Sequence, residues 1–91
     1  MQIYTNNDFD QSLDEILDYI ALDSLEKALD FVHELQTKFE TLPFMPYKFR
    51  KSIYFDNENI RDFIYKGYVI PYLVDQECIV ILGIVKYRET L

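Results

Sequence analysis

Basic side chains in the C-terminal half are the residues whose types and spacing could do chemistry. Lys86 and Arg88 alternate with Val85 and Tyr87 at the end of an apolar, strand-like run, so the two cations share one face. Such a pair could bind an anion, or it could mark a solvated strand end. Further cations upstream could join them in a local basic patch that contacts a target. The candidate target-binding residues are Arg50, Lys51, Arg61, Lys86 and Arg88.

Arg61 and Tyr87 each allow two interpretations. Arg61 lies in a predicted strand and could contact a phosphate or another part of a target. It could also form a structural ion pair with Asp62, Asp75 or Glu77. Tyr87 could stack on a base or take a proton. In a chain with eight tyrosines, a half-buried sheet residue whose hydroxyl reaches water is the favoured interpretation.

Other reactive residue types lack the spacing of a catalytic or metal site. His33, the one histidine, is predicted on a helix surface, and Cys78 is expected to pack as a small hydrophobe. One cysteine and one histidine give no paired ligand spacing. Gly67 and Gly83 are too few for a glycine-rich phosphate loop, and no nucleophile elbow is present. The sequence therefore predicts neither a metal site nor a cofactor.

Cysteine usage and hydropathy indicate the compartment. A single cysteine cannot form an internal disulfide, which fits a reducing cytosol. No basic segment followed by an apolar run opens the chain, and no uncharged run reaches the roughly 18 residues of a membrane span. We expect a cytoplasmic protein that does not bind membranes.

The net charge of −7 is unevenly distributed. Through Leu42 there are ten acidic residues against two lysines, and from Pro43 onward there are seven basic residues against six acidic ones. An anionic partner would therefore meet the C-terminal half and a basic partner the N-terminal half, unless the acidic side chains are simply solvated helix faces. Long-range repulsion from phosphates disfavours a target rich in nucleic acid, and we expect no sequence-specific DNA binding.

The segment from Ile60 to Arg88 predicts the sheet. Two turns, Lys66-Gly67 and Asp75-Gln76-Glu77, divide it into three consecutive antiparallel strands. The middle strand shows alternating apolar residues. The last, with an almost unbroken apolar run from Ile79 to Val85, suits a strand buried on both faces.

The N-terminal half predicts an edge strand and a helical hairpin. Met1 to Tyr4 fits an edge strand. The first helix begins at Asp8 with Gln11 as its capping-box partner, or at Ser12 with Glu15. Asp23 or Ser24 ends it and caps the second helix, which Pro43 and Pro46 stop. The apolar stripe of that second helix is Leu25, Ala28, Leu29, Val32, Leu35, Phe39 and Leu42.

The segment from Pro43 to Asn59 is expected to be an extended connection, with or without a strand of its own, and Asp56 to Asn59 a turn. The fold class is therefore α+β in a single domain, residues 1–91: an N-terminal edge strand, a two-helix hairpin, and a three- or four-stranded antiparallel sheet. A chain this short has little spare stability, so a homodimer would help it.

The order and spacing of several motifs resemble the RelE/ParE superfamily of toxins from bacterial type II toxin-antitoxin systems. The resemblance covers nearly the whole chain. It implies the fold above, a role in growth inhibition and plasmid stabilisation, and a small antitoxin that wraps the toxin. The matching features are Leu13–Ala21 (LDEILDYIA), Ala28 with Leu29, Leu42 followed by Pro43 and Pro46, Arg61 before an apolar pair, Tyr68–Val74 (YVIPYLV) and Ile81–Arg88 (ILGIVKYR).

The superfamily divides by target. RelE-like members cut mRNA in the ribosomal A site with basic residues and a His or Tyr near the C-terminus, whereas ParE-like members inhibit DNA gyrase. Here Lys86 stands where many members have His, and a lysine is a poor acid-base group at neutral pH. Arg88 matches the family's terminal arginine.

The resemblance therefore favours a ParE-like protein that inhibits gyrase by binding and is neutralised by an antitoxin, which the helical-hairpin groove and the exposed sheet edge would receive. The first alternative is a RelE-like, ribosome-dependent mRNA endonuclease; the second is a non-toxic binding or dimerising member of the family. The candidate nuclease residues are Arg50, Lys51, Arg61, Lys86, Tyr87 and Arg88.

Overall fold

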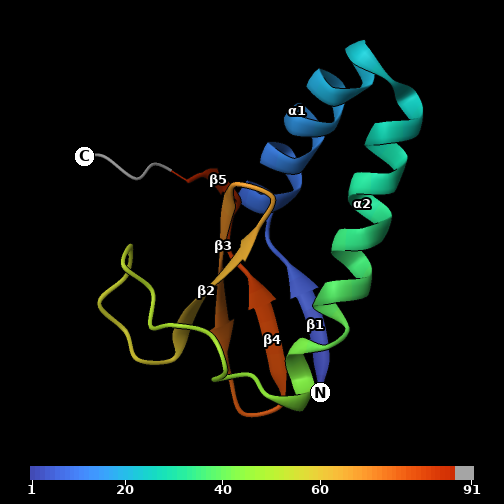
Figure 1. The fold of residues 1–91 in the computed structure, drawn as a ribbon. Coiled ribbons are helices and arrows are strands. Elements are labelled where there is room, and N and C mark those ends of the chain that lie inside the picture. Colours follow the sequence, from blue (N-terminus) through green and yellow to red (C-terminus); the bar gives the residue numbers. More distant parts are fainter. Residues whose placement is uncertain (88–91) are drawn as a thin grey trace.

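The structure is a computed structural model that describes residues 1–87, and in it a helical hairpin covers one face of a five-stranded sheet (Figure 1). The elements follow one another in the predicted order, which confirms the α+β class. They are β1 (Gln2–Thr5), α1 (Asn7–Asp23), α2 (Leu25–Phe39), the 3-10 helix η1 (Leu42–Phe44), β2 (Ile60–Tyr65), β3 (Tyr68–Val74), β4 (Cys78–Ile81) and β5 (Val85–Lys86).

The strand order across the sheet is β1-β4-β3-β2, and β5 pairs with the beginning of β3. β2, β3 and β4 are consecutive antiparallel neighbours, as predicted. β1 is the predicted edge strand, but it runs parallel to β4, with Ile3 opposite Ile79, so the sheet is mixed. Parallel neighbours need a long connection, which the intervening helices and strands supply. Within residues 1–87, no strand pairs with the outer edge of β1.

A β-bulge interrupts the apolar run that was predicted as one strand from Ile79 to Val85. Between the residues that pair with β4 and those that pair with β5, β3 has two residues. The facing chain has three residues there, Leu82 to Ile84, which is one more than β3. The extra residue reverses the alternation of side chains, so that Ile84 is 3% exposed in the core and Val85 is 44% exposed. The pairs that flank the bulge are Tyr72 with Ile81 and Val69 with Val85.

The position of the bulge follows from a proline in the neighbouring strand. The N–H of Leu82 donates to the carbonyl of Pro71 at 2.9 Å, but Pro71 has no N–H with which to return a bond. The ladder is therefore weakest at this point, and the chain can insert a residue without losing a further donor.

Polar side chains cap both helices, one of them at a position that was not predicted. Asn6 has an extended backbone and caps α1, since its Oδ1 accepts a hydrogen bond from the N–H of Phe9 at 2.9 Å. The predicted caps Asp8 and Ser12 lie inside the helix. Ser24 joins the two helices as predicted, and its hydroxyl accepts a hydrogen bond from the first turn of α2 at 3.2 Å.

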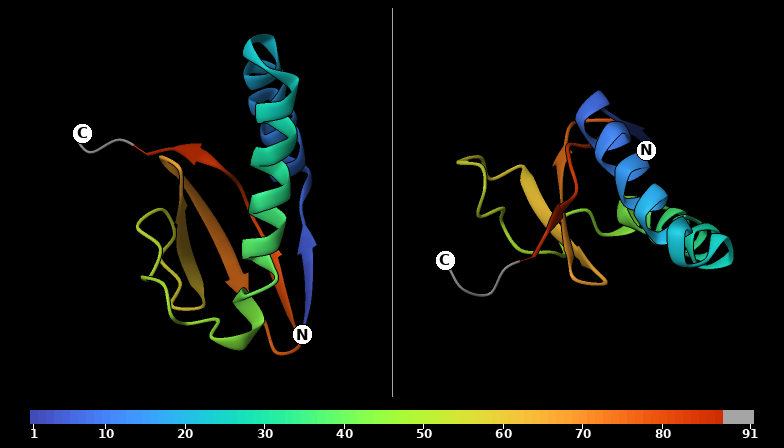
Figure 2. Two further views of the ribbon diagram at one scale, coloured as in Figure 1. Left: turned by 45° about the vertical axis from the view of Figure 1, so that its right-hand side comes forward. Right: turned by 90° about the horizontal axis from the view of Figure 1, so that it is seen from above.

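The connected end of the helical hairpin projects beyond the sheet (Figures 1 and 2). The predicted stripe of α2 is therefore only partly in the core. Leu25 and Leu29 are 66% and 58% exposed, whereas Phe31, which the predicted stripe omits, is buried. At 3.6 residues per turn, Leu29 lies roughly 120° around the helix from Leu35, so it faces away from the side of α2 that packs on the sheet. The stripe follows the helical period correctly near Leu35 and Phe39, where the sheet is present.

The connection between η1 and β2 lies along the outer edge of β2 and forms no strand of its own. An isolated bridge joins Lys51 to Arg61, and the N–H of Ser52 donates to the carbonyl of Ile60 at 2.8 Å. The predicted turn is present, since the N–H of Ile60 also donates to Asn57 O at 3.1 Å. This connection covers the edge of β2 and leaves the edge of β1 open.

Aromatic rings link the helices to the sheet. The Phe31 ring centroid lies 5.1 Å from that of Tyr65 on β2, and the Tyr65 hydroxyl donates to the Phe31 carbonyl at 3.1 Å. Phe39 lies 5.8 Å from Phe9 and 6.3 Å from Phe63. The edge-to-face contacts of Phe31 and Phe39 fix α2 on one face of the sheet, and the tilted contact between Phe9 and Phe39 joins α1 to α2. Of the helices described, neither is long and apolar enough to cross a membrane.

Candidate functional site

Arg61 is held by the connection before β2. Its Nε donates to the carbonyl of Glu58 at 3.2 Å and its Nη1 to that of Phe49 at 3.4 Å. Its guanidinium carbon lies 4.9 Å from the centre of the Tyr47 ring. Among residues 1–87, Arg61 does not form the ion pair that was one of its two predicted roles. It contacts two carbonyl groups and an aromatic ring instead of a carboxylate. Arg61 therefore clamps this connection onto the sheet.

Arg50 is also engaged, in an ion pair with Asp62. Its Nη2 and Nε both lie 3.2 Å from Oδ2 of Asp62, whose side chain is fully buried. The same oxygen accepts a hydrogen bond from the N–H of Ile53 at 3.1 Å, while the other carboxylate oxygen, Oδ1, has no partner among residues 1–87. A buried carboxylate needs such partners, so this pair fixes the backbone of the connection.

The remaining predicted cations lie in two places. Lys51 is exposed at the outer edge of β2, beside Arg50 and Arg61. Lys86 lies on β5 opposite Tyr68, and its Nζ is 5.7 Å from the centre of that ring. Arg61 is opposite Tyr72, on the other side of β3, and Tyr72 lies four residues, or roughly 13 Å, along β3 from Tyr68. The structure thus brings together the three cations at the β2 edge and places Lys86 apart; Arg88 lies outside the described residues.

Of the other candidate residues, two are exposed and one is half-buried. Tyr87 is exposed, and its backbone N–H donates to the carbonyl of Gly67 at 2.7 Å. His33 is exposed on α2, as predicted, and Cys78 is half-buried at the start of β4. In the part of the chain that the structure describes, no three His, Cys, Asp or Glu side chains are placed to hold a metal ion.

Two buried tyrosines hold their protons more firmly than usual. The hydroxyl of Tyr72 donates to the carbonyl of Pro46 at 2.6 Å, and burial raises the pKa of Tyr72 to about 12. Burial likewise raises the pKa of Tyr65. Neither phenol is suited to accept a proton near neutral pH, so both act as hydrogen-bond donors that tie helix and connection to the sheet.

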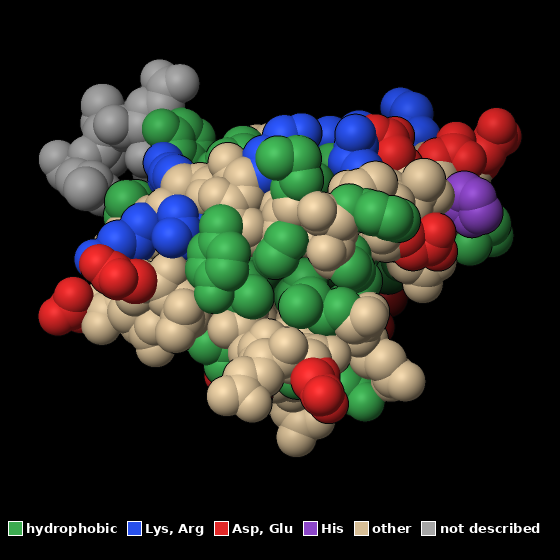
Figure 3. Space-filling model, turned by 90° about the horizontal axis from the view of Figure 1, so that it is seen from below, with side chains coloured by type: hydrophobic (Ala, Val, Ile, Leu, Met, Phe, Trp, Pro, Cys, Tyr) green, Lys and Arg blue, Asp and Glu red, His purple; other side chains and the backbone are tan. Residues whose placement is uncertain are grey.

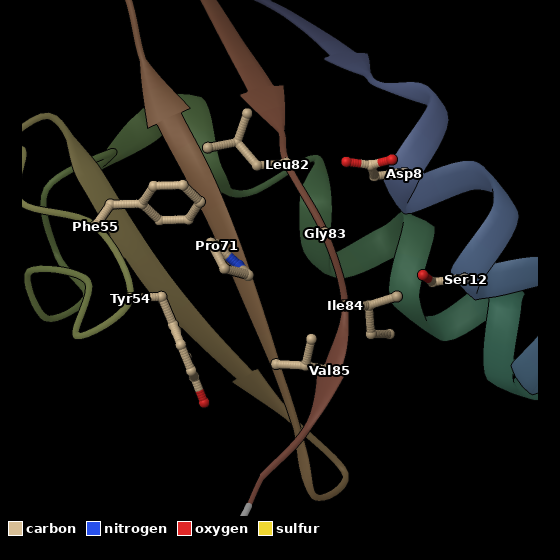
Figure 4. Close-up of a pocket in the computed structure, with 9 residues that line it drawn as sticks. All are labelled: Asp8, Ser12, Tyr54, Phe55, Pro71, Leu82, Gly83, Ile84 and Val85. Carbon is tan, nitrogen blue, oxygen red and sulfur yellow. The ribbon is translucent and has the colours of Figure 1, made fainter.

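A pocket of about 260 Å³ opens beside the bulge (Figure 4). Tyr54 and Phe55 from the connection lie on one side of it, and Asp8 and Ser12 from α1 lie on the other. Gly83 leaves the middle unfilled, since a Cβ there would meet no atom within 4 Å. The other lining residues are Pro71, Leu82, Ile84 and Val85. Its walls are apolar, with one carboxylate and one hydroxyl at the α1 side.

Sequence reasoning missed this pocket. The signal was Gly83, because a glycine within an apolar strand run marks a bulge or a place where another group approaches closely. The pocket adjoins exposed apolar side chains that we call the aromatic loop surface, which consists of Ile53, Tyr54, Phe55 and Val85. The connection that carries most of it lies on the side of the sheet away from the helices (Figure 2).

Comparison with known proteins identifies relatives over almost the full length. The model of the family described as ParE toxin of type II toxin-antitoxin system, parDE, matches residues 3–91. A solved structure described as the chromosomal ParDE TA system from P. aeruginosa is 24% identical, with a TM-score of 0.78 over 97% of each chain. At this identity the likeness shows the fold. No curated protein matches the chain.

Proposed function

We propose that this chain, which belongs to the ParE toxin family of type II toxin-antitoxin systems, inhibits DNA gyrase by binding it and is neutralised by a cognate antitoxin. The chain is accordingly the toxin of such a pair. Gyrase as the target, and binding rather than cleavage as the mode of action, are our proposal.

Our preference for gyrase binding over mRNA cleavage rests on the contacts that the basic side chains make within the protein. A ribosome-dependent nuclease needs cations free to meet phosphates and an acid-base group beside them. Arg50 is paired with Asp62, and Arg61 holds two carbonyl groups and a ring. Lys86 lies at a separate place on the sheet. This arrangement supports a toxin that acts by occupying a surface of its target.

We assign target binding to the aromatic loop surface together with Lys51. Exposed aromatic and branched side chains on a fixed backbone are typical of binding hot spots, because little conformational entropy is lost when they dock. Here the backbone is fixed by Asp62, which accepts from the N–H of Ile53, and by the Ser52 hydroxyl, which accepts from the N–H of Tyr54 at 3.1 Å. The adjoining pocket can receive one apolar side chain of the target.

We assign antitoxin binding in part to the outer edge of β1. Its backbone groups have no strand partner among residues 1–87, and an added strand would satisfy them. The edge lies at the opposite side of the sheet from β2 (Figure 1), so antitoxin and gyrase would meet different edges. Neutralisation would then act by wrapping the toxin.

The test is a supercoiling reaction with purified gyrase, relaxed plasmid and increasing amounts of the toxin. We expect supercoiling to stop in proportion to toxin, and to recover when the co-expressed antitoxin is added. A parallel translation reaction should leave mRNA intact. Message cut within codons would replace this proposal with the endonuclease. Folded toxin without effect in either reaction would leave a non-toxic binding or dimerising member of the family.

A further inference from the structure

The pocket beside the bulge has a carboxylate at one side and two aromatic rings at the other. In Figure 4 the carboxylate of Asp8 points from α1 toward the chain around Gly83, and Tyr54 and Phe55 lie on the opposite side. Ser12, about one helical turn after Asp8, adds a hydroxyl. The walls between the two sides are apolar. A group that fills this pocket therefore meets apolar surface along its length and a negative charge at its far end.

The Asp8 carboxylate has no positive partner within residues 1–87. None of the ion pairs in this range includes it, and no lysine or arginine of this range lines the pocket. Asp8 lies in the first turn of α1, where the helix dipole favours a carboxylate. Asp10 lies in the same turn but does not line the pocket. The charge of Asp8 is therefore available to a cation that enters the pocket, and Asp10 is its matched control.

The size of the pocket suits one long side chain. Its volume of about 260 Å³ lies below the range of roughly 300–1,000 Å³ that is usual for small-molecule sites. Arginine and lysine carry a charge on an apolar stem. Of the two, arginine has a planar guanidinium whose N–H groups can bond a carboxylate and a hydroxyl together, and it stacks on aromatic rings. The pocket offers all of these groups, so its chemistry is that of an arginine site.

We propose that this pocket binds an arginine side chain of gyrase. The inference rests on the proposed function and names the chemistry of one contact in the target interface. The arginine enters from the aromatic loop surface, passes over Gly83 and lies against Ile84. Its guanidinium pairs with the carboxylate of Asp8 and donates to the hydroxyl of Ser12. An uncharged side chain would fit the apolar walls but would gain nothing from the charge of Asp8.

A second recess has apolar walls but the opposite charge. It has a volume of about 200 Å³, and its lining includes Phe44 of η1 and Lys48. The Lys48 ammonium lies 5.6 Å from the centre of the Phe49 ring. Figure 3 views the end of the molecule opposite to the connected end of the hairpin, and there hydrophobic side chains lie beside lysines and arginines. A guanidinium would be repelled by such cations, so this recess is an internal control for the charge preference.

Two small probes test the charge preference of the pocket on the free toxin. n-Butylguanidine is positively charged at neutral pH, and n-butylurea has nearly the same shape without the charge. In NMR titrations of nitrogen-labelled toxin, the guanidine should shift the backbone N–H signals of Gly83 and Ile84 with about fivefold higher affinity than the urea. Asp8→Asn should remove this difference and Asp10→Asn should keep it. The signal of Phe44 should show no preference for the guanidine.

Three results of these titrations would overturn the inference. They are equal affinity for the two probes, an unchanged preference for the guanidine in Asp8→Asn, and no shift at Gly83 with either probe.

The supercoiling reaction tests the same contact with gyrase. Gly83→Leu fills the pocket, and the fold should persist because Gly83 has no positive φ and a Cβ there meets no atom within 4 Å. Circular dichroism checks the fold. Gly83→Leu should raise the toxin concentration that halves supercoiling about tenfold, and Asp8→Asn about fivefold. The control Asp10→Asn should stay within about twofold of wild type. If Gly83→Leu does not fold, Asp8→Asn alone decides.

The outcomes with gyrase separate the inference from the proposed function. Full inhibition by the folded pocket variants would overturn the inference while leaving gyrase as the target. Wild-type toxin that does not inhibit gyrase would contradict the proposed function, and with it gyrase as the source of the arginine, even where the probes reveal a guanidinium site.

Discussion

Arg50 and Asp62 hold the connection after η1 against the outer edge of the sheet. Both Nη2 and Nε of Arg50 lie 3.2 Å from Oδ2 of a carboxylate that is fully buried. Within the described part of the chain, the other oxygen of Asp62 has no partner, so the carboxylate charge depends on Arg50 and on the N–H of Ile53. The aromatic loop surface begins at Ile53, and the ion pair therefore determines where that surface lies.

Removing the cation should destabilise the protein. Arg50→Met keeps most of the aliphatic stem but leaves the Asp62 carboxylate buried without a counter-charge, which costs about 3 kcal/mol of unfolding free energy. Urea denaturation monitored by circular dichroism measures it. The control, Lys51→Met, changes an exposed neighbour that forms no ion pair among residues 1–87 and should stay within about 0.5 kcal/mol of wild type. Equal stability of the two variants would contradict the assigned role of Arg50.

Stability should fall in strongly alkaline solution because of Tyr72. Its pKa is raised by burial from 10.0 to about 12 in the folded protein, so between these pH values the unfolded chain loses a proton that the folded chain keeps. The contribution is complete below pH 10 and is lost as the pH rises toward 12. Tyr65, whose pKa is also raised, acts in the same direction.

Urea titrations at pH 9, 10 and 11 measure this decline. Tyr72→Phe should flatten it and, through loss of the bond to Pro46, should lower stability at neutral pH by about 1 kcal/mol. Tyr19→Phe, a change at an exposed phenol, serves as control and should keep the wild-type slope. A Tyr72→Phe protein with the full alkaline decline would rule out Tyr72 as its source.

The two glycines should differ in their tolerance of alanine. Gly67 has φ +83° in the turn between β2 and β3, a conformation that costs an L-residue roughly 1–2 kcal/mol. Gly83 lies in the bulge, where a Cβ meets nothing within 4 Å. Gly67→Ala should therefore lower the melting temperature by several degrees, and Gly83→Ala should leave it nearly unchanged. Calorimetry of both variants checks the contrast, which would be refuted by equal melting temperatures.

Substitutions in the aromatic loop surface should weaken the inhibition of gyrase and have little effect on the stability of the fold. Tyr54→Ala with Phe55→Ala removes two exposed rings, and we expect at least a tenfold increase in the toxin concentration that halves supercoiling. Phe44→Ala with Met45→Ala, also exposed but on η1 and just after it, is the matched control and should inhibit as wild type. Full inhibition by the loop variant would move target binding to another surface.

Several elements could be predicted because their causes lie within a few residues. Lys66-Gly67 forms the predicted turn since its backbone needs positive φ, which glycine adopts readily. Ser24 both ends one helix and caps the next. The predicted N-cap of α1 was wrong because Asp8, Ser12 and Asn6 are all competent caps. Only the exit of β1, where the N–H of Asn6 donates to Ile81 O, selects among them.

The candidate site was predictable in composition but not in arrangement. Arg50 and Arg61 could be chosen as cations from the sequence. Their partners Asp62 and Phe49 are each 12 residues away and meet them only when the connection lies along β2. The pocket likewise requires Tyr54 and Asp8, which are far apart in the sequence, to approach each other.

The sequence by itself determined the element order, the turns and the helical period, because each depends on neighbours along the chain. The tertiary structure decided which side chains are covered. Helical spacing predicts a broad apolar stripe that includes Leu25, Leu29 and Leu35, but only the packing of α2 on the sheet determines that Leu35 is buried and the other two are exposed. In the same way, Pro71 and the bulge beside it turn Val85 outward and Ile84 inward, since strand register is a property of two strands together.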